Sequence, residues 1–390
     1  MSQPLGFESS GKSLVCKLHK AIYDLKQAPR AWFDKLKATL FHLNFQISKC
    51  DPSLFVYSHA NNVIYILVYV DDIIITGNNT AFLRNIVSQL NSAFSLKDLG
   101  RLDYFLGIEV KSNSDGSLTL TQSKYVLDLL NRTNMENSNS ITSPMVSGCK
   151  LSKSGSDKFL DVSLYRSVVG ALQYATITRP EISFSVNKVC QFMSNPLEQH
   201  WSAVKRILRY LKGTMSLGLH LQPTPPNSPL SIHAYYDVDW ASDPDDRRST
   251  SGAAIFVGPN LISWWSKKQT IVARSSIEAE YRSLALATVE VLWIQTLLSE
   301  LHVSHYSPVI YCDNMSTIAL AHNPVLHART KHMELDLFFV REKVAANLLH
   351  VVHVPAIDQY TDILTKSLSP SRFCELRSKL KLADSSPHPT

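Results

Sequence analysis

The sequence predicts a mixed α/β chain divided into more than one domain. Its 390 residues suffice for two or three domains that each bury a core. Runs of β-branched and aliphatic residues typical of strands occur in both halves, and segments with helical spacing of apolar residues lie between and after them. Residues 222–229 carry four prolines in eight positions. We place the main domain boundary there, because proline neither continues a helix nor donates to a sheet.

The first element is a hairpin that carries two adjacent aspartates. Asp71 and Asp72 lie between the apolar, β-branched runs 63–70 and 73–75, which predicts a tight hairpin buried on at least one face. Burying ionised carboxylates without partners costs several kcal/mol each. A divalent cation is the natural partner, and hard oxygen ligands favour Mg²⁺.

The middle of the chain is predicted to be helical. Residues 138–156 are polar and Ser-rich, which indicates a loop or linker. Residues 164–176 and 201–211 have apolar positions at helical spacing. The second helix has a basic face, which either follows a phosphate backbone or is a solvated surface. The residues of this basic face are Lys205, Arg206, Arg209 and Lys212.

The last third begins with strands followed by a long helix. Residues 231–240 alternate well enough for a first strand that ends at Asp237, with Asp239 as the competing carboxylate, and a hairpin is expected to turn at 258–260. Ser275 and Glu278 form an S-x-x-E capping box that starts the helix.

Glu280 differs from Glu278, because it lies on the apolar stripe of the predicted helix, where a carboxylate requires a metal. That stripe consists of Leu284, Ala287, Val291, Ile294 and Leu298.

Two more carboxylates follow predicted strands. The strand 309–312 delivers Asp313 at its C-terminal end, and Asn314 opens a helix. After the strand 348–355, Asp362 lies in the first turn of another helix. Asp313 is well placed for a metal ligand, whereas Asp362 is either a ligand or a favourable charge at a helix N-terminus.

Several ordered segments resemble reverse transcriptases of copia-type LTR retrotransposons. KLHKAIYDLKQAPRAWFDKL, YVDD and LKDLGRLDYFLGIEV follow one another as in that family. Later segments resemble its connecting and ribonuclease H parts, so the resemblance covers nearly the whole chain. These are YRSVVGALQYATITRPEISFSVN, HWSAVKRILRYLKGT, DRRSTSGAAIFVG, SSIEAEY, CDN and YTDILTK.

The resemblance implies the C-terminal part of a Pol polyprotein, of class α/β (α+β). The implied parts are a truncated reverse transcriptase palm (1–137), a linker with helical thumb and connection (138–221), a Pro-rich linker (222–230), a ribonuclease H-like mixed-sheet domain (231–383) and a disordered tail (384–390).

The same resemblance implies functional residues and partners. The implied activity is hydrolysis of RNA in RNA:DNA hybrids by two-metal catalysis, with Mg²⁺, or Mn²⁺ as an alternative. The implied catalytic and metal-binding residues are Asp237, Glu280, Asp313 and Asp362 in the ribonuclease H part, and Asp71 and Asp72 in the polymerase part. The implied nucleic-acid-binding residues are Gln27, Arg30, Gly107 (in a primer grip), Lys205, Arg206 and Arg209.

Expected partners are an RNA:DNA hybrid, a primer-template and the rest of the polyprotein. The family implies a cytoplasmic virus-like particle or the nucleus. No apolar run approaches the roughly 20 residues of a membrane span, and no secretion signal opens the chain, which predicts an intracellular protein. The net charge of +6 suits a polyanionic partner. Six scattered cysteines without C-x-x-C pairing are expected to be reduced, structural thiols.

The chain departs from the family in its polymerase part. The family's third catalytic Asp lies on an earlier strand, whereas this chain begins at MSQPLGF, and Asp24 replaces a usual Gly. We therefore expect the chain alone to be a poor or inactive DNA polymerase; the alternative is polymerase activity that depends on an N-terminal segment supplied by a longer product. The alternative to an enzyme is a catalytically inactive relic or a nucleic-acid-binding protein.

Three further features have mainly structural interpretations. His353 precedes VPA inside a strand and is expected to be a core or surface histidine rather than a catalytic one. The acidic loop 242–249 lacks the Gly and Glu of an EF-hand and is expected to be salt-bridged by Arg247 and Arg248. Of Trp264 and Trp265, alternation places one in the core, and either could stack on a hybrid.

Overall fold

The computed structural model describes residues 25–94, 96–225, 228–323 and 333–384. The chain divides into two compact units, residues 1–100 and 101–390. Both contain helices and sheets, which confirms the expected mixed α/β class. The domain boundaries at 137/138 and 222–230 stay predictions. The predictions for Asp24 and Cys16, and for the tail beyond Asp384, lie outside the described residues.

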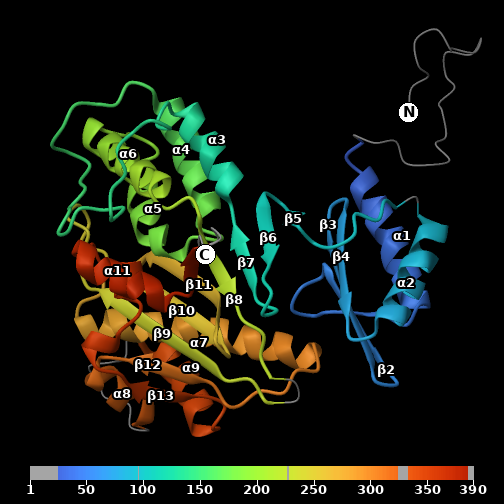
Figure 1. Cartoon of the computed structure of the whole chain (residues 1–390). Helices are drawn as coiled ribbons and strands as arrows, with labels where there is room; N and C mark the ends of the chain where they lie inside the picture. Colours follow the sequence, from blue (N-terminus) through green and yellow to red (C-terminus); the bar gives the residue numbers. More distant parts are fainter. Residues whose placement is uncertain (1–24, 95, 226–227, 324–332, 385–390) are drawn as a thin grey trace, which may run out of the picture. The chain divides into compact units, whose positions relative to one another are not determined.

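The first unit is a four-stranded antiparallel sheet packed against two helices (Figure 1). Alternate residues of β3 are buried, namely Ile64, Ile66 and Val68, and they meet Leu36 and Leu90 from the helices. The elements are α1 (Ala28–His42), β1 (Gln46–Ile47), β2 (Leu54–His59), β3 (Asn62–Tyr69), β4 (Asp72–Gly77) and α2 (Thr80–Ala93).

The second unit opens with a sheet and a group of helices. The helices expected at 164–176 and 201–211 are confirmed as α4 and α6, whose apolar faces are buried together. The sheet has the order β14-β8-β7-β6-β5. Its strands are β5 (Tyr104–Phe105), β6 (Ile108–Ser112), β7 (Leu118–Thr121), β8 (Leu217–Leu221) and β14 (Leu382–Asp384); the helices are α3 (Ser123–Arg132), α4 (Val162–Ala175), η1 (Pro180–Ile182), α5 (Ser183–Cys190) and α6 (Glu198–Lys212).

The other sheet of this unit has the order β11-β10-β9-β12-β13. In this sheet, β9 and β11 both pair antiparallel with β10. The strands β12 and β13 run parallel to β9, as expected for a mixed sheet. The predicted turn is confirmed at Gly258, which has φ +57°. The elements are β9 (Ile232–Asp239), β10 (Thr250–Val257), β11 (Asn260–Lys268), α7 (Ser276–Glu300), β12 (Val309–Cys312), α8 (Met315–His322), α9 (Glu334–Ala345), β13 (His350–His353), η3 (Ala356–Asp358), α10 (Asp362–Thr365) and α11 (Pro370–Lys379).

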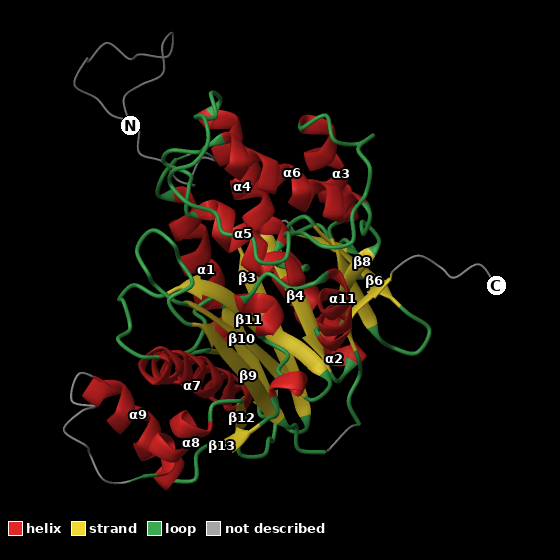
Figure 2. Cartoon of the chain, turned by 90° about the vertical axis from the view of Figure 1, so that its left-hand side faces the viewer, coloured by secondary structure: helices red, strands yellow, loops and turns green. Residues whose placement is uncertain are grey.

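Helices cover both faces of this mixed sheet (Figure 2). Ile255 faces α7 and α9, whereas Phe256 faces the apolar cluster built from α3 to α6, α10 and α11. Trp264 and Trp265 follow the same alternation, and Trp264 donates to the Thr176 carbonyl oxygen at 3.1 Å. Elements before and after residues 222–230 therefore share one core. Among the described helices, none has the length and apolar content needed to cross a membrane.

A close approach between β10 and α10 requires glycine at position 252. Gly252 pairs with Asp237 of β9 across the ladder. A Cβ at Gly252 would lie 2.7 Å from the Leu364 Cβ and 2.9 Å from the Thr365 Cγ2. These distances are shorter than van der Waals contact, so any larger residue must push α10 away from the sheet.

We therefore expect Gly252→Ala to lower the free energy of unfolding by about 1–3 kcal/mol, the usual cost of overpacking a core. Urea denaturation measures this. The matched control is Gly170→Ala in α4, where an added Cβ meets nothing within 4 Å. Alanine there should keep or raise stability, because glycine in a helix interior costs conformational entropy. Equal midpoints for Gly252→Ala and the unchanged protein would contradict the close-approach argument.

Candidate metal centre

Asp237 lies on the central strand of the mixed sheet and is almost fully buried, with 2% exposure. Its carboxylate accepts hydrogen bonds from the Thr365 hydroxyl and from the Lys366 ammonium, the latter at 3.0 Å. Both donors belong to the segment at and after α10. A buried carboxylate needs such partners, because its desolvation costs several kcal/mol.

Glu280 comes from the first turns of α7. The Ser275 hydroxyl accepts from the Glu278 amide at 3.2 Å, as expected for the predicted helix start, and the Glu278 carboxylate accepts from the Arg274 amide at 2.8 Å. Glu280 has 7% exposure, and its Oε2 has no hydrogen-bond partner within the part of the chain that the structure describes. Burial, then the charges of Asp237 and Asp313, raise the pKa of Glu280 to about 9.

Asp313 and Asp362 lie where the sequence placed them. Asp313 follows β12, and the Asn314 side chain caps α8 by accepting from the Ser316 and Thr317 amides. Asp362 is the first residue of α10. Burial, followed by the charge of Asp237, raises the pKa of both carboxyl groups.

The four carboxylates interact through space, so the structure brings together the predicted set. Asp237 is the shared neighbour that raises the pKa values of Glu280, Asp313 and Asp362. The competing residue Asp239 is two positions along the strand, and burial raises its pKa as well. Acids that influence one another in this way carry an excess of negative charge, which a divalent cation would relieve.

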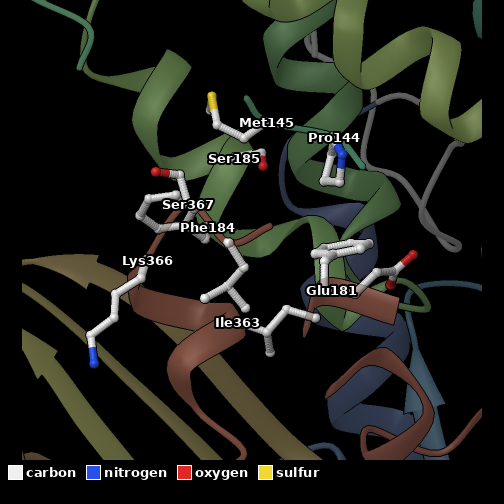
Figure 3. A pocket seen from close by; sticks show the side chains of 10 residues that line it. Pro144, Met145, Glu181, Phe184, Ser185, Ile363, Lys366 and Ser367 are labelled. Carbon is white, nitrogen blue, oxygen red and sulfur yellow. The ribbon is translucent and has the colours of Figure 1, made fainter. Parts of the chain in front are cut away.

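Lys366 is a member of this group that the sequence reasoning missed. Its Nζ lies 3.0 Å from Asp237 and 2.7 Å from Asp362. Burial lowers the pKa of Lys366, but the two carboxylates more than offset this and hold it above its ordinary value. Lys366 lines a small pocket together with Phe184 and Ile363, and Figure 3 shows the end of its side chain pointing away from these apolar residues. The available signal was the i, i+4 spacing of opposite charges in YTDILTK.

Three possible ligand atoms are especially close. One oxygen each of Glu280 and Asp313 and the sulfur of Cys312 lie within 4.8 Å of one another. The unpaired Oε2 of Glu280 and the carboxylates around it fit a hard divalent cation such as Mg²⁺. Cys312 had not been predicted as a site residue.

The YVDD segment forms the predicted hairpin, but its carboxylates are not buried. Tyr69 pairs with Asp72, so Val70 and Asp71 form a two-residue turn. Val70 has φ +51°, a conformation that β-branched residues rarely adopt. Asp71 and Asp72 are both exposed. The argument that burial forces a cation onto them was therefore wrong, because only one face of β3 is buried.

The predicted nucleic-acid contacts outside α6 are two exposed polar side chains and one glycine in a turn. Gln27 and Arg30 are exposed at the start of α1. Gly107 occupies a hairpin turn with φ +76°, and an added Cβ would lie 3.2 Å from the hydroxyl of Tyr174. Gly107 therefore has a structural role, because the turn conformation and the contact with α4 both favour glycine.

The basic face of α6 is partly occupied by the chain itself. Arg206 donates to the Ser143 hydroxyl at 3.1 Å, and Arg209 donates to the Asn139 carbonyl oxygen at 2.7 Å. Lys205 is half-buried. The Ser-rich loop thus covers part of the surface expected to follow a phosphate backbone.

The remaining candidates are structural. The acidic loop is salt-bridged, but its main cation is Lys268 rather than the predicted Arg247 and Arg248, at 2.6 Å from Asp243 and 2.9 Å from Asp246. Arg248 lies farther, at 3.7 Å from Asp246. His353 ends β13 and is exposed, consistent with a surface histidine.

The raised pKa of Glu280 predicts a pH-dependent stability. With a folded-state pKa of about 9 against an ordinary 4.5, Glu280 ionises first in the unfolded chain. Rising pH across this interval therefore destabilises the metal-free protein by up to about 1.4 kcal/mol per unit. Glu280→Gln should raise the melting temperature at pH 8 but not at pH 5 when a chelator is present.

The control for this measurement is Glu342→Gln, which removes an exposed carboxylate paired with Lys343. It should shift the melting temperature little at either pH. A gain at pH 8 that is no larger for Glu280→Gln than for Glu342→Gln would show that Glu280 is not destabilised by its surroundings.

Comparisons with known proteins find one family match and several relatives. Residues 1–147 match the family described as reverse transcriptase (RNA-dependent DNA polymerase). The chain is 49% identical, over 97% of its length, to the retrovirus-related Pol polyprotein from transposon RE1 of Arabidopsis thaliana, and 36% identical, over 96%, to that from transposon TNT 1-94 of Nicotiana tabacum. It spans 26% and 28% of those two polyproteins, or about a quarter of their length.

Two other similarities concern shorter proteins. An uncharacterized mitochondrial protein of Arabidopsis thaliana is 46% identical over 59% of this chain and 93% of its own length. A solved N-terminal ribonuclease H domain from Mycobacterium tuberculosis, fused to maltose binding protein, aligns with 38% of this chain and 97% of that chain at 14% identity. Its TM-score of 0.26 is too low to support a conclusion. The sequence relatives and the reverse transcriptase match show that the chain belongs to the Pol polyprotein family of copia-type LTR retrotransposons.

Proposed function

We propose that the part of the chain built on the mixed sheet is a ribonuclease H, which hydrolyses the RNA strand of RNA:DNA hybrids. The observation that carries this proposal is the convergence of Asp237, Glu280, Asp313 and Asp362 from four separate elements, with the Glu280 Oε2 buried and unpaired in the described structure. Buried acids that perturb one another's pKa values in this way are typical of functional sites, and here the function would depend on a cation.

Each of the four carboxylates would bind the cations from a different side of the site. Two divalent cations, when bound, orient the attacking water and stabilise the departing 3′-oxygen. Asp237 is central, and the Thr365 hydroxyl fixes the orientation of its carboxylate. Asp313 and Asp362 approach from the ends of β12 and α10, and Glu280 approaches from α7. Oxygen ligands favour Mg²⁺, with Mn²⁺ as an alternative.

The basic character of the chain supports a nucleic-acid substrate. The net charge is +6 although the site itself is acidic, so positive charge elsewhere can attract phosphates. Gln27, Arg30 and Lys205 remain proposed contacts. We infer that the hybrid, a primer-template and the rest of the Pol polyprotein are the partners.

The direct test is magnesium-dependent cleavage of an RNA:DNA hybrid labelled on the RNA strand. Asp313→Asn should lower the cleavage rate by about 100-fold or more, because it removes a charged metal ligand. The matched control is Asp128→Asn, which changes an exposed carboxylate on α3 and should cleave at the normal rate.

Absence of cleavage by folded protein would refute the proposal. If that protein still binds the hybrid, the alternative of a nucleic-acid-binding relic is favoured. Cleavage that persists in Asp313→Asn would instead assign the activity to a different site.

We further infer that the YVDD hairpin alone does not support DNA synthesis. Asp71 and Asp72 are exposed to water, and two solvated carboxylates supply fewer ligands than a pair of cations requires. Primer extension on an RNA template should therefore be no greater with the unchanged chain than with Asp72→Asn. Extension that Asp72→Asn abolishes would show that the hairpin is a working polymerase centre.

A further inference from the structure

Cys312 has an unusual setting beside the proposed metal ligands. It is the last residue of β12, directly before Asp313, and its side chain is fully buried. Its sulfur accepts a hydrogen bond from the Tyr236 hydroxyl at 2.9 Å and another from the Asn314 amide at 3.2 Å. The Cys312 thiol in turn donates to the Asn314 carbonyl oxygen at 3.6 Å. Donors aimed at the sulfur, such as the Tyr236 hydroxyl, are typical of the surroundings of metal ligands.

The geometry around this sulfur suits a shared ion. Its distance to one oxygen each of Glu280 and Asp313 is at most 4.8 Å, and the two oxygens are as close to each other. Zinc binds sulfur at about 2.3 Å and carboxylate oxygen at about 2.0–2.2 Å. Atoms within 4.8 Å of one another can surround one ion once their side chains move to these distances.

Glu280 supplies a second observation that points to a cation. It is more than nine-tenths buried, at 7% exposure, and its Oε2 has no hydrogen-bond partner among the described residues. An unsatisfied buried acceptor is costly. Lys366, the nearby cation, is paired with Asp237 and Asp362 instead.

We propose that Glu280, Cys312 and Asp313 form a binding site for a thiophilic divalent cation, of which Zn²⁺ is the representative. Binding forms one metal–sulfur bond and metal–oxygen bonds to Glu280 and Asp313, and it releases to solvent the thiol proton and any proton held by the two carboxyl groups. A thiolate ligand favours Zn²⁺ or Cd²⁺ over Mg²⁺, which prefers oxygen. Because two of the three ligands belong to the proposed nuclease centre, the bound ion would exclude Mg²⁺ and inhibit cleavage; this last step rests on the proposed function.

Cadmium is the probe for the sulfur ligand, because a Cd²⁺–thiolate bond produces an ultraviolet charge-transfer band. One equivalent of Cd²⁺ added to the full chain should produce this band in the unchanged protein and in Cys374→Ser. The band should be absent in Cys312→Ser. Calorimetric titration should show the Zn²⁺ affinity falling by about tenfold or more in Cys312→Ser and unchanged in Cys374→Ser.

A second variant keeps the thiol in place. Tyr236→Phe removes only the hydroxyl that donates to the sulfur, so it should weaken Zn²⁺ binding while the cadmium band remains at saturation. Circular dichroism shows whether Cys312→Ser folds. If it does not, the test is the comparison of Tyr236→Phe with Cys374→Ser. Weaker Zn²⁺ binding by Tyr236→Phe supports the site, and equal Zn²⁺ binding by the two variants overturns it.

The outcomes separate this inference from the proposed nuclease function. A cadmium band that depends on Cys312, without hybrid cleavage under any condition, would support the metal site and refute the nuclease. Cleavage without such a band, or with a band that persists in Cys312→Ser, would overturn the inference alone. With both intact, Zn²⁺ added in the presence of excess Mg²⁺ should inhibit the unchanged protein more strongly than Cys312→Ser.

Discussion

The ion pairs that join Lys366 to Asp237 and Asp362 are the interaction on which the centre of the second unit depends. One ammonium group stands among four carboxylates, and it contacts two of them directly. Burial, followed by the charge of Asp237, raises the pKa values of Glu280, Asp313 and Asp362 although Lys366 acts in the opposite direction. In the protein without a bound cation, protons on the carboxyl groups neutralise part of the remaining negative charge.

This electrostatic constraint explains features of the surrounding packing. Lys366 and Thr365 reach Asp237 only because α10 lies directly against β10, and Gly252 permits that approach. Ile363 and Leu364 belong to the apolar cluster that α3 to α6 also build. The helices before the Pro-rich segment therefore help to hold Asp362 in place. We infer that the proposed nuclease needs more of the chain than residues 231–383.

Much of the centre could be predicted from local patterns. Glu280 shares a helical stripe with Leu284 and Val291, so its direction followed from the helical period, and Asp313 followed from the end of a short apolar strand. Lys366 and Cys312 could not be identified in this way. Their roles depend on which elements meet in three dimensions, namely α10 with β9, and β12 with the Tyr236 hydroxyl. The same limit applies to Asp71 and Asp72, whose exposure depends on the hairpin turn, and to Arg206, which the Ser-rich loop contacts.

The central claim is that the four carboxylates of Asp237, Glu280, Asp313 and Asp362 bind divalent cations. The most direct measurement is an anomalous difference map from crystals of the chain grown with Mn²⁺. The account predicts density bound by Asp237, Glu280 and Asp313 at about 2.0–2.3 Å from their oxygens, with the Lys366 ammonium moved off Asp237. A map without density there, in which Lys366 still contacts both Asp237 and Asp362 at a saturating Mn²⁺ concentration, would contradict the account.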